Sequence, residues 1–288
     1  MKIHLVDGTY ELFRSFYGPP PKKAPDGREV GATIGLLRSL LALISEPDVT
    51  HIACAFDHVV ESFRNELYAG YKTGEGINPD LFAQFPLAEE AVAAMGIVVW
   101  PMVEFEADDA IATAAVRFQD EPGVEQVVIC SPDKDLAQLV NDKVVCWDRR
   151  REIIYNEAAV IEKYGVAPAS IPDWLALVGD KADGIPGIPA WGAKSAADLL
   201  AHFQHIEEIP EDIEQWDMTA GRARRLAANL ADQREGAFLY RRLTTLRTDV
   251  PLVEGLDDLE WRGAREGFRQ LCAELGANDL PDRIPGWI

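Results

Sequence analysis

The stretch Lys2-Ile3-His4-Leu5-Val6-Asp7 is a largely apolar run that ends in an aspartate. Two later runs end in the same way: Ile52 to Phe56 leads into Asp57, and Gln126 to Cys130 leads into Ser131-Pro132-Asp133. Near-continuous apolar runs without alternation are typical of parallel strands covered on both faces. The runs therefore predict an α/β fold with a mainly parallel central sheet flanked by helices. In such sheets a functional site lies beyond the carboxyl ends of the strands, which is where these aspartates stand.

Acidic residues gather at this predicted edge. Besides Asp7 and Asp57, carboxylates occur in three short groups, Glu106-Ala107-Asp108-Asp109, Asp133-Lys134-Asp135 and Asp180-Lys181-Ala182-Asp183, which makes nine in all. A single acid after a strand is usually a turn residue or a helix cap, and acids in a first helical turn also suit the helix dipole. Nine anions cannot share one cleft unpaired, because like charges raise one another's pKa. The whole set therefore predicts hard divalent cations, Mg²⁺ or Mn²⁺, which prefer oxygen ligands.

The 288-residue chain carries a formal charge of −20, which argues against a generally basic nucleic-acid coat. The charge is unevenly spread. Acids crowd residues 207–217, a predicted solvated face, whereas residues 222–247 hold seven arginines against two acids. A local basic stripe of this kind can bind phosphates even on an acidic protein.

The cysteines show no zinc-finger or redox spacing, and Cys54, Cys130 and Cys146 lie inside apolar runs while Cys272 lies in a helical one. They are expected to be small buried hydrophobic residues in a reducing compartment. No leader segment is expected, and no apolar run reaches membrane-spanning length. The expected location is cytoplasmic, with no membrane partner.

The periodicity of the apolar residues and the positions of glycine and proline predict the remaining helices and strands. Helices are expected over residues 10–17, 30–45, 80–95, 107–118, 171–178 and 193–203, and strands over 97–103 and 143–147, the latter being the last clear strand. The glycine-rich segment 61–80 is less regular and is well placed to form a mobile cover over the site. From residue 166 onward the character changes to helices joined by tight loops, so we place a domain boundary there.

The most specific stretch runs from Gly179 to Ala197. It almost makes a nucleotide-binding Walker A loop, but Ala193 separates Gly192 from Lys194-Ser195 and no strand precedes it. The stretch suits instead a helix-loop-helix pair whose small residues, including Gly187, let backbone N–H groups approach a phosphate, with Lys194 adding charge. Such binding follows the nucleic-acid backbone and is independent of sequence.

At these residues the chain resembles the 5′ nuclease family, which comprises the 5′-3′ exonuclease domain of bacterial DNA polymerase I, phage exonucleases and flap endonucleases. The resemblance runs from Val6-Asp7-Gly8 through the acidic groups and the Gly179 to Ala197 stretch, and weakly on to about Asp249. No polymerase follows, so a stand-alone member is expected. The resemblance implies a structure-selective nuclease, a 5′-3′ exonuclease or flap endonuclease that hydrolyses DNA phosphodiester bonds by a two-metal-ion mechanism in replication and repair.

The resemblance also implies the domain organisation. Residues 1–165 would form a PIN-like nuclease core with a gateway segment at about 58–95. Residues 166–288 would form a helical DNA-binding subdomain with a helix-three-turn-helix at about 171–203.

The resemblance further assigns the acids to two ions, either Mg²⁺ or Mn²⁺. Asp7, Asp57, Glu106 and Asp108 would surround one ion, and Asp109, Asp133, Asp135, Asp180 and Asp183 the other, directly or through water. Asp133 is also expected to be essential for catalysis. Loop carbonyls of the helix-three-turn-helix would hold a K⁺ ion.

The gateway residues are assigned in the same way. Arg64 and Lys72 would face the scissile phosphate, and Tyr71 would stack on an unpaired base. The DNA contacts expected elsewhere are Gly187, Gly192, Lys194, Ser195, Arg222 and Arg225. The chain departs from the family pattern at Glu75, where an arginine is usual, at Pro132, where a glycine is common, and at Ala190-Trp191, where a glycine and a small apolar residue are common.

Expected partners are DNA with 5′ flaps, ends or RNA primers, and a DNA polymerase, with the protein itself a monomer. Three alternatives stay open from the residues. One is a DNA-binding relative that has lost or weakened cleavage, which the intact carboxylate set opposes. The second is a PIN-type ribonuclease, whose domains are shorter and lack the Gly179 to Ala197 stretch. The third is a phosphotransfer receiver or a haloacid-type phosphatase. Those proteins need an acid pair on an early strand, and Asp7-Gly8-Thr9 does not supply one.

Overall fold

The computed structural model describes residues 1–288, which fold into two compact units. Unit 1 consists of Met1–Ser62, Gly74–Ser131 and Arg247–Ile288, and unit 2 consists of Phe63–Thr73 and Pro132–Leu246. The boundary between the two units falls at residue 132, whereas the sequence analysis places a domain boundary near residue 166. The reason is that the elements between residues 132 and 165 pack against the helices that follow them.

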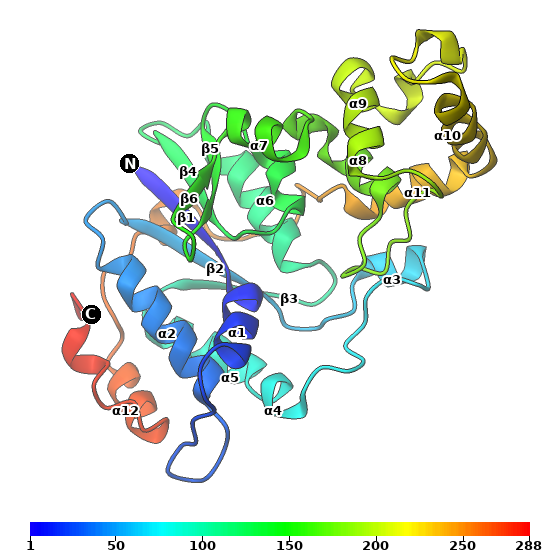
Figure 1. Ribbon diagram of the computed structural model, residues 1–288. Helices are drawn as coiled ribbons and strands as arrows, with labels where there is room; N and C mark the ends of the chain where they lie inside the picture. The colour runs from blue at the N-terminus through cyan, green and yellow to red at the C-terminus, as the bar shows by residue number, and fades with distance from the viewer. The chain divides into compact units, whose positions relative to one another are not determined.

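Four parallel strands form the sheet of unit 1 (Figure 1): β1 (Lys2–Asp7), β2 (His51–Asp57), β3 (Val98–Met102) and β4 (Gln126–Cys130), in the order β3-β2-β1-β4. In register, Leu5 stands between Ala53 and Ile129, and all three are fully buried. The predicted strands and the mainly parallel sheet are thereby confirmed. Burial on both faces explains why the runs lack polar alternation.

The helices of unit 1 are α1 (Gly8–Tyr17), α2 (Gly31–Ile44), α4 (Pro79–Phe82), α5 (Phe85–Ala94), α6 (Ala107–Phe118) and α12 (Gly267–Glu274), with short 3₁₀ turns η5 (Leu256–Leu259) and η6 (Pro281–Arg283). The continuous helix predicted over 80–95 is wrong, because it breaks between α4 and α5. Gln84 at the break is buried and its side chain accepts from Thr33 N at 3.0 Å and donates to Asp80 O at 3.0 Å. Pro86 then occupies the first turn of α5, the position in a helix that proline tolerates.

The last segment of the chain returns to unit 1. Trp261 N donates to Thr50 O at 2.8 Å and Arg265 N donates to Ala94 O at 2.9 Å. Gly263 also lies so close to Gly96 that a Cβ on Gly96 would stand 2.0 Å from Gly263 O. Residues 247–288 are therefore an integral part of unit 1.

Unit 2 is mainly helical. Its elements are α3 (Phe63–Leu67), η1 (Asp135–Leu139), β5 (Val144–Asp148), β6 (Ile153–Tyr155), α7 (Glu157–Tyr164), η2 (Pro168–Ser170), α8 (Ile171–Val178), α9 (Ala193–Phe203), η3 (Ile206–Glu208), η4 (Ile213–Gln215), α10 (Ala220–Asp232) and α11 (Arg234–Thr244). The predicted bounds of α8 and α9 are confirmed, and α8 packs against both α9 and α11. Strand β6, which pairs antiparallel with β5, was not predicted, because it is only three residues long and Ile153 and Ile154 are exposed.

All four cysteines are free and buried, as predicted. No helix of the structure combines the length and the apolar character that crossing a membrane requires.

Candidate metal centre and nucleic-acid interface

The strand ends of unit 1 present two aspartates, as the sequence predicts. Asp7 is buried and caps α1: its Oδ1 accepts from Tyr10 N at 2.8 Å, and its Oδ2 accepts from Ser131 Oγ at 2.9 Å. At the end of β2, Asp57 Oδ1 accepts from Ala107 N at 2.8 Å. Each carboxylate is thus oriented by a neighbouring loop or helix start.

The start of α6 supplies three more acids of unit 1, and they differ in their surroundings. Glu106 is buried and accepts from Ser62 Oγ at 2.6 Å, while Asp108 is half-buried in the first turn. Asp109 is fully buried, and both of its oxygens accept backbone hydrogen bonds, from Arg247 N at 2.9 Å and from Glu106 N at 3.0 Å. Backbone donors therefore orient both oxygens of Asp109, which the sequence expects to serve an ion directly or through water.

Three acids of unit 2 form a compact cluster, Asp135, Asp180 and Asp183. One oxygen from each lies within 4.8 Å of the others, with Asp135 and Asp180 buried and Asp183 half-buried. Asp133, at the same turn as Asp135, is exposed and accepts from Asp135 N at 2.9 Å. The structure therefore brings together three of the five acids assigned to the second ion and places Asp133 beside them.

The electrostatics of this acidic cluster favour a cation. Burial raises the pKa of the Asp135 carboxyl well above its usual range, and the charges of Asp133, Asp183 and Asp180 raise it further. Asp135 Oδ1 is buried without any hydrogen-bond partner. A divalent ion with oxygen ligands would supply the missing partner of a buried carboxylate that lies close to two others. The donor set therefore fits Mg²⁺ or Mn²⁺.

Two lysines already approach the acidic cluster. Lys134 pairs with Asp180, and Lys72 Nζ lies 3.4 Å from Asp183 Oδ1. The sequence expects Lys72 to face the scissile phosphate, and the structure places its ammonium beside Asp183 of the acidic cluster.

A tight loop holds Asp180 and Asp183. Asp180 N donates to Ile185 O at 2.8 Å, and Ile185 N donates back to Asp180 O at 2.7 Å. Gly184 within the loop has φ +74°, and a Cβ there would stand 2.1 Å from Gly70 O. Lys72 N also donates to Asp183 O at 3.0 Å, so residues 70–72 of the gateway segment lie against the acidic loop.

Two gateway residues, Arg64 and Tyr71, have buried side chains. Arg64 is 1% exposed, and its Nε donates to Leu243 O at 2.8 Å while its Nη2 lies 3.4 Å from Thr245 O. Tyr71 is 4% exposed and packs with Ile185 and Leu243. The roles expected of Arg64 at the scissile phosphate and of Tyr71 in base stacking stay predictions. In the structure both side chains anchor the gateway segment to α11.

The loop between α8 and α9 shows which of its small residues are needed for folding. Gly187 has φ +71°, and a Cβ there would stand 2.6 Å from Gly179 N. Around Gly192 a Cβ would meet nothing within 4 Å, so this glycine at the N-cap of α9 leaves open space for another molecule. Lys194, in the next turn, is exposed.

The departure at Ala190-Trp191 has a structural basis. Ala190 has φ +69°, a left-handed backbone that favours glycine. Trp191 is buried, donates from Nε1 to Leu226 O at 3.1 Å and packs edge-on against Trp216 at 6.2 Å between ring centroids. The large side chain therefore fixes the loop to α10, where the family more commonly has a small residue.

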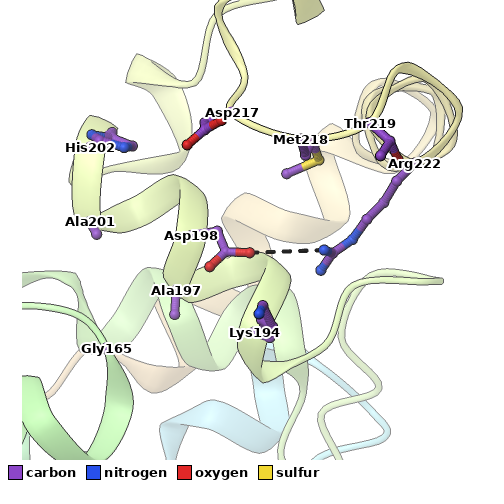
Figure 2. A pocket seen from close by; sticks show the side chains of 10 residues that line it. All are labelled: Gly165, Lys194, Ala197, Asp198, Ala201, His202, Asp217, Met218, Thr219 and Arg222. Carbon is purple, nitrogen blue, oxygen red and sulfur yellow. Dashed lines mark ion pairs between the residues drawn. The ribbon is translucent and has the colours of Figure 1, made fainter.

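A cavity of about 610 Å³ lies over α9 and the start of α10 (Figure 2), lined by Gly165, Lys194, Ala197, Asp198, Ala201, His202, Asp217, Met218, Thr219 and Arg222. Arg222 Nη2 donates to Ser195 Oγ at 2.6 Å, and its Nη1 lies 3.9 Å from Asp198 Oδ2. Ser195 is buried, and the DNA contact expected of it stays a prediction. Arg225 is exposed, as its expected role requires. Asp198, which also lines this cavity, was not singled out from the sequence.

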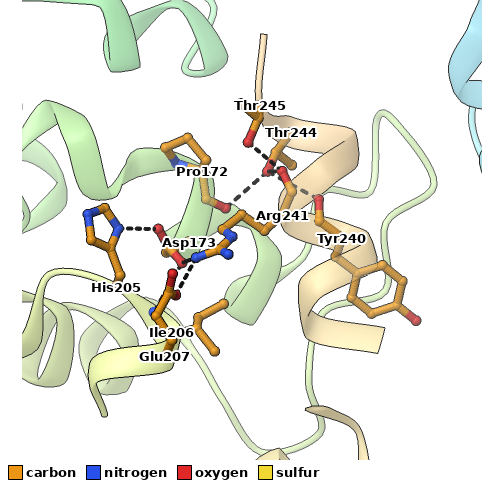
Figure 3. A network of polar contacts seen from close by, with 9 residues as sticks. All are labelled: Pro172, Asp173, His205, Ile206, Glu207, Tyr240, Arg241, Thr244 and Thr245. Atoms are coloured by element: carbon orange, nitrogen blue, oxygen red, sulfur yellow. Dashed lines mark hydrogen bonds and ion pairs between the residues drawn. The ribbon is translucent and has the colours of Figure 1, made fainter. Parts of the chain in front are cut away.

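Arg241, another arginine of the basic stripe, makes hydrogen bonds and ion pairs within unit 2 (Figure 3). Asp173, buried at the start of α8, accepts from Arg241 Nη1 at 3.0 Å and from Ile206 N at 3.1 Å, and its other oxygen lies 2.9 Å from His205 Nδ1. Arg241 also pairs with Glu207. The network ties α8 to α11 and η3, and no local signal in the sequence singles out Asp173.

Two family models match the chain. The model of the 5′-3′ exonuclease N-terminal resolvase-like domain covers residues 2–165, and that of the 5′-3′ exonuclease C-terminal SAM fold covers residues 166–267.

Among similar proteins, a 5′-3′ exonuclease of Aquifex aeolicus is 34% identical over 259 residues, which cover 90% of this chain and 86% of that protein. DNA polymerase I of Bacillus caldotenax is 36% identical over 289 residues, which cover 98% of this chain and 32% of that protein. The chain thus spans about a third of the length of that polymerase. The flap endonuclease D15 of bacteriophage T5, solved with DNA and metal ions, shares the fold with a TM-score of 0.68 and 19% identity, covering 98% of this chain and 96% of that one.

Proposed function

Because the chain belongs to the 5′-3′ exonuclease family, we propose that it hydrolyses phosphodiester bonds of DNA at 5′ ends and 5′ flaps, using two divalent cations. The observation that carries the proposal is the acidic cluster of Asp135, Asp180 and Asp183, with its one unsatisfied buried oxygen. The T5 D15 flap endonuclease, which shares the fold and was solved with DNA, supports the choice of substrate.

The acids would divide between the ions. Asp7, Asp57, Glu106 and Asp108 would hold one ion, and the acidic cluster, with Asp133 beside it, would hold the other. When bound, the cations would activate water and offset the charge that builds up on the phosphate oxygens. The chain itself then needs to orient the acids, which the contacts of Asp7, Asp57 and Asp180 with neighbouring donors do.

Basic groups would position the DNA. We propose that Lys72 faces the scissile phosphate from its place beside Asp183. Lys194 and the open space at Gly192 would accept the duplex backbone at the start of α9, with Arg225 as a further contact. Arg222 would act indirectly, by fixing Ser195.

Finer features of the proposal follow the family resemblance. K⁺ would be the ion held by carbonyls of the loop before α9, a DNA polymerase would be the partner, and the protein would act as a monomer in the cytoplasm.

The deciding experiment is cleavage of an end-labelled 5′ flap beside a matched single strand, with Mg²⁺ and with chelator. Asp180→Asn should abolish cleavage and leave DNA binding unchanged or tighter, since removing negative charge does not weaken the attraction of a phosphate. Glu211→Gln, which neutralises an exposed acid of the same unit, is the matched control and should cut normally. Wild-type cleavage by Asp180→Asn would overturn the metal assignment. Flap binding by the wild type without cleavage would favour a catalytically weakened relative.

A further inference from the structure

The end of α11 and the two residues that follow it, 243–246, exchange hydrogen bonds with other segments of unit 2. Leu243 O accepts from Arg64 of α3 at 2.8 Å, and Thr244 Oγ1 donates to Pro172 O of α8 at 3.0 Å (Figure 3). Thr244 O accepts from Gln138 of η1 at 2.9 Å. The last carbonyls of a helix have no partner within it, so they are available for such contacts.

Gln138 uses its whole amide group in this arrangement. Its Nε2 donates to Asp135 O at 2.8 Å and to Thr244 O at 2.9 Å, and its Oε1 accepts from Leu246 N at 3.0 Å. Two donor hydrogens and one acceptor are thereby engaged, all with backbone groups. The side chain joins the turn that carries Asp135 to the end of α11.

The position of Asp135 depends on these hydrogen bonds of Gln138 between η1 and the end of α11. Its side-chain Oδ1 has no hydrogen-bond partner, so no donor fixes this oxygen in place. The residue begins η1, a single 3₁₀ turn whose hydrogen bonds are weaker than those of an α-helix. Its neighbours Asp180 and Asp183, in contrast, lie in a loop closed by paired backbone hydrogen bonds.

We propose that Gln138 is a positioning residue for metal binding: by joining Asp135 to the end of α11, it keeps the Asp135 carboxylate facing Asp180 and Asp183. The inference rests on the proposed metal site of the acidic cluster. Residues that orient metal ligands commonly change metal affinity by about ten- to a hundredfold when they are replaced.

The test is direct titration of the metal-free protein with Mn²⁺, followed by electron paramagnetic resonance. Gln138→Met keeps the length of the side chain and removes its three hydrogen bonds, so it should weaken Mn²⁺ binding about tenfold. Gln138→Asn is the second variant. It keeps an amide but is one methylene shorter and cannot reach Asp135 O and Thr244 O together, so it should shift affinity in the same direction even if Gln138→Met fails to fold.

Thr244→Val is the matched control, because it removes the buried hydrogen bond to Pro172 O from the same turn and leaves the bonds of Gln138 intact. It should lower the thermal midpoint as the Gln138 variants do, yet leave Mn²⁺ affinity unchanged. If the Gln138 variants also lower only the thermal midpoint, the positioning role is refuted. Asp180→Asn separates the two hypotheses: it should lose one bound Mn²⁺ per chain, and failure to do so would refute the metal site itself.

Discussion

Replacing Gly184 by alanine tests the geometry of the acidic loop most directly. The glycine has φ +74°, and a Cβ would stand 2.1 Å from Gly70 O, a backbone atom that cannot swing aside. A left-handed alanine costs about 1 kcal/mol. Overpacking that forces a backbone shift costs about 1–3 kcal/mol more. Gly184→Ala should therefore lower the free energy of unfolding by about 2–4 kcal/mol.

A loss of this size should lower the thermal midpoint by roughly 3–7 °C for a chain of this length. Calorimetry of the metal-free protein measures it. Because Gly184 follows Asp183 directly, the same variant should also weaken Mn²⁺ binding.

Gly192→Ala is the matched control for this prediction. Gly192 has φ −139°, and a Cβ there would meet nothing within 4 Å. The control should unfold within about 2 °C of the wild type. If both variants unfold at the wild-type temperature, the close approach of Gly184 to Gly70 is refuted.

Three further predictions concern separate sites. Asp135 has a pKa raised above its unfolded value of 3.8, so in metal-free protein its ionisation opposes folding as pH rises above that value. Asp135→Asn should therefore raise the thermal midpoint of the metal-free protein at pH 7 and not at pH 3. Equal midpoints of variant and wild type at pH 7 would contradict the raised pKa of Asp135. Trp191→Ala removes a buried indole and its bond to Leu226 O, so it should destabilise the protein by about 3–5 kcal/mol in denaturant titrations, whereas a loss below 1 kcal/mol would count against the anchor. Lys194→Ala should reduce the slope of log affinity for duplex DNA against log salt by about one unit in binding isotherms; an unchanged slope would remove Lys194 from the interface.

The sequence predicted those elements whose signals are local. The strands of unit 1 follow from their apolar runs, and α6, α8 and α9 have the predicted bounds because Glu106, Gly179 and Gly192 mark helix ends. The break between α4 and α5 escaped prediction, since it depends on the contact of Gln84 with Thr33, about fifty residues earlier.

The same distinction between local and long-range signals applies to the candidate site. The acids at strand and helix ends could be named from the sequence, and the structure groups Asp135, Asp180 and Asp183. The burial of Arg64 could not be predicted, because its acceptor Leu243 is 179 residues away. Asp173 and Gln138 were missed for the same reason: their partners lie in α11, far along the chain.

The return of residues 247–288 to unit 1 has a consequence for synthesis on the ribosome. Every residue of unit 2 has been made once Leu246 is added, whereas unit 1 still lacks its final segment. Until then Thr50 O and Ala94 O have no Trp261 or Arg265 to accept from, and the close contact of Gly96 with Gly263 cannot form. The unit whose first strand is translated earliest is therefore the one that is completed last.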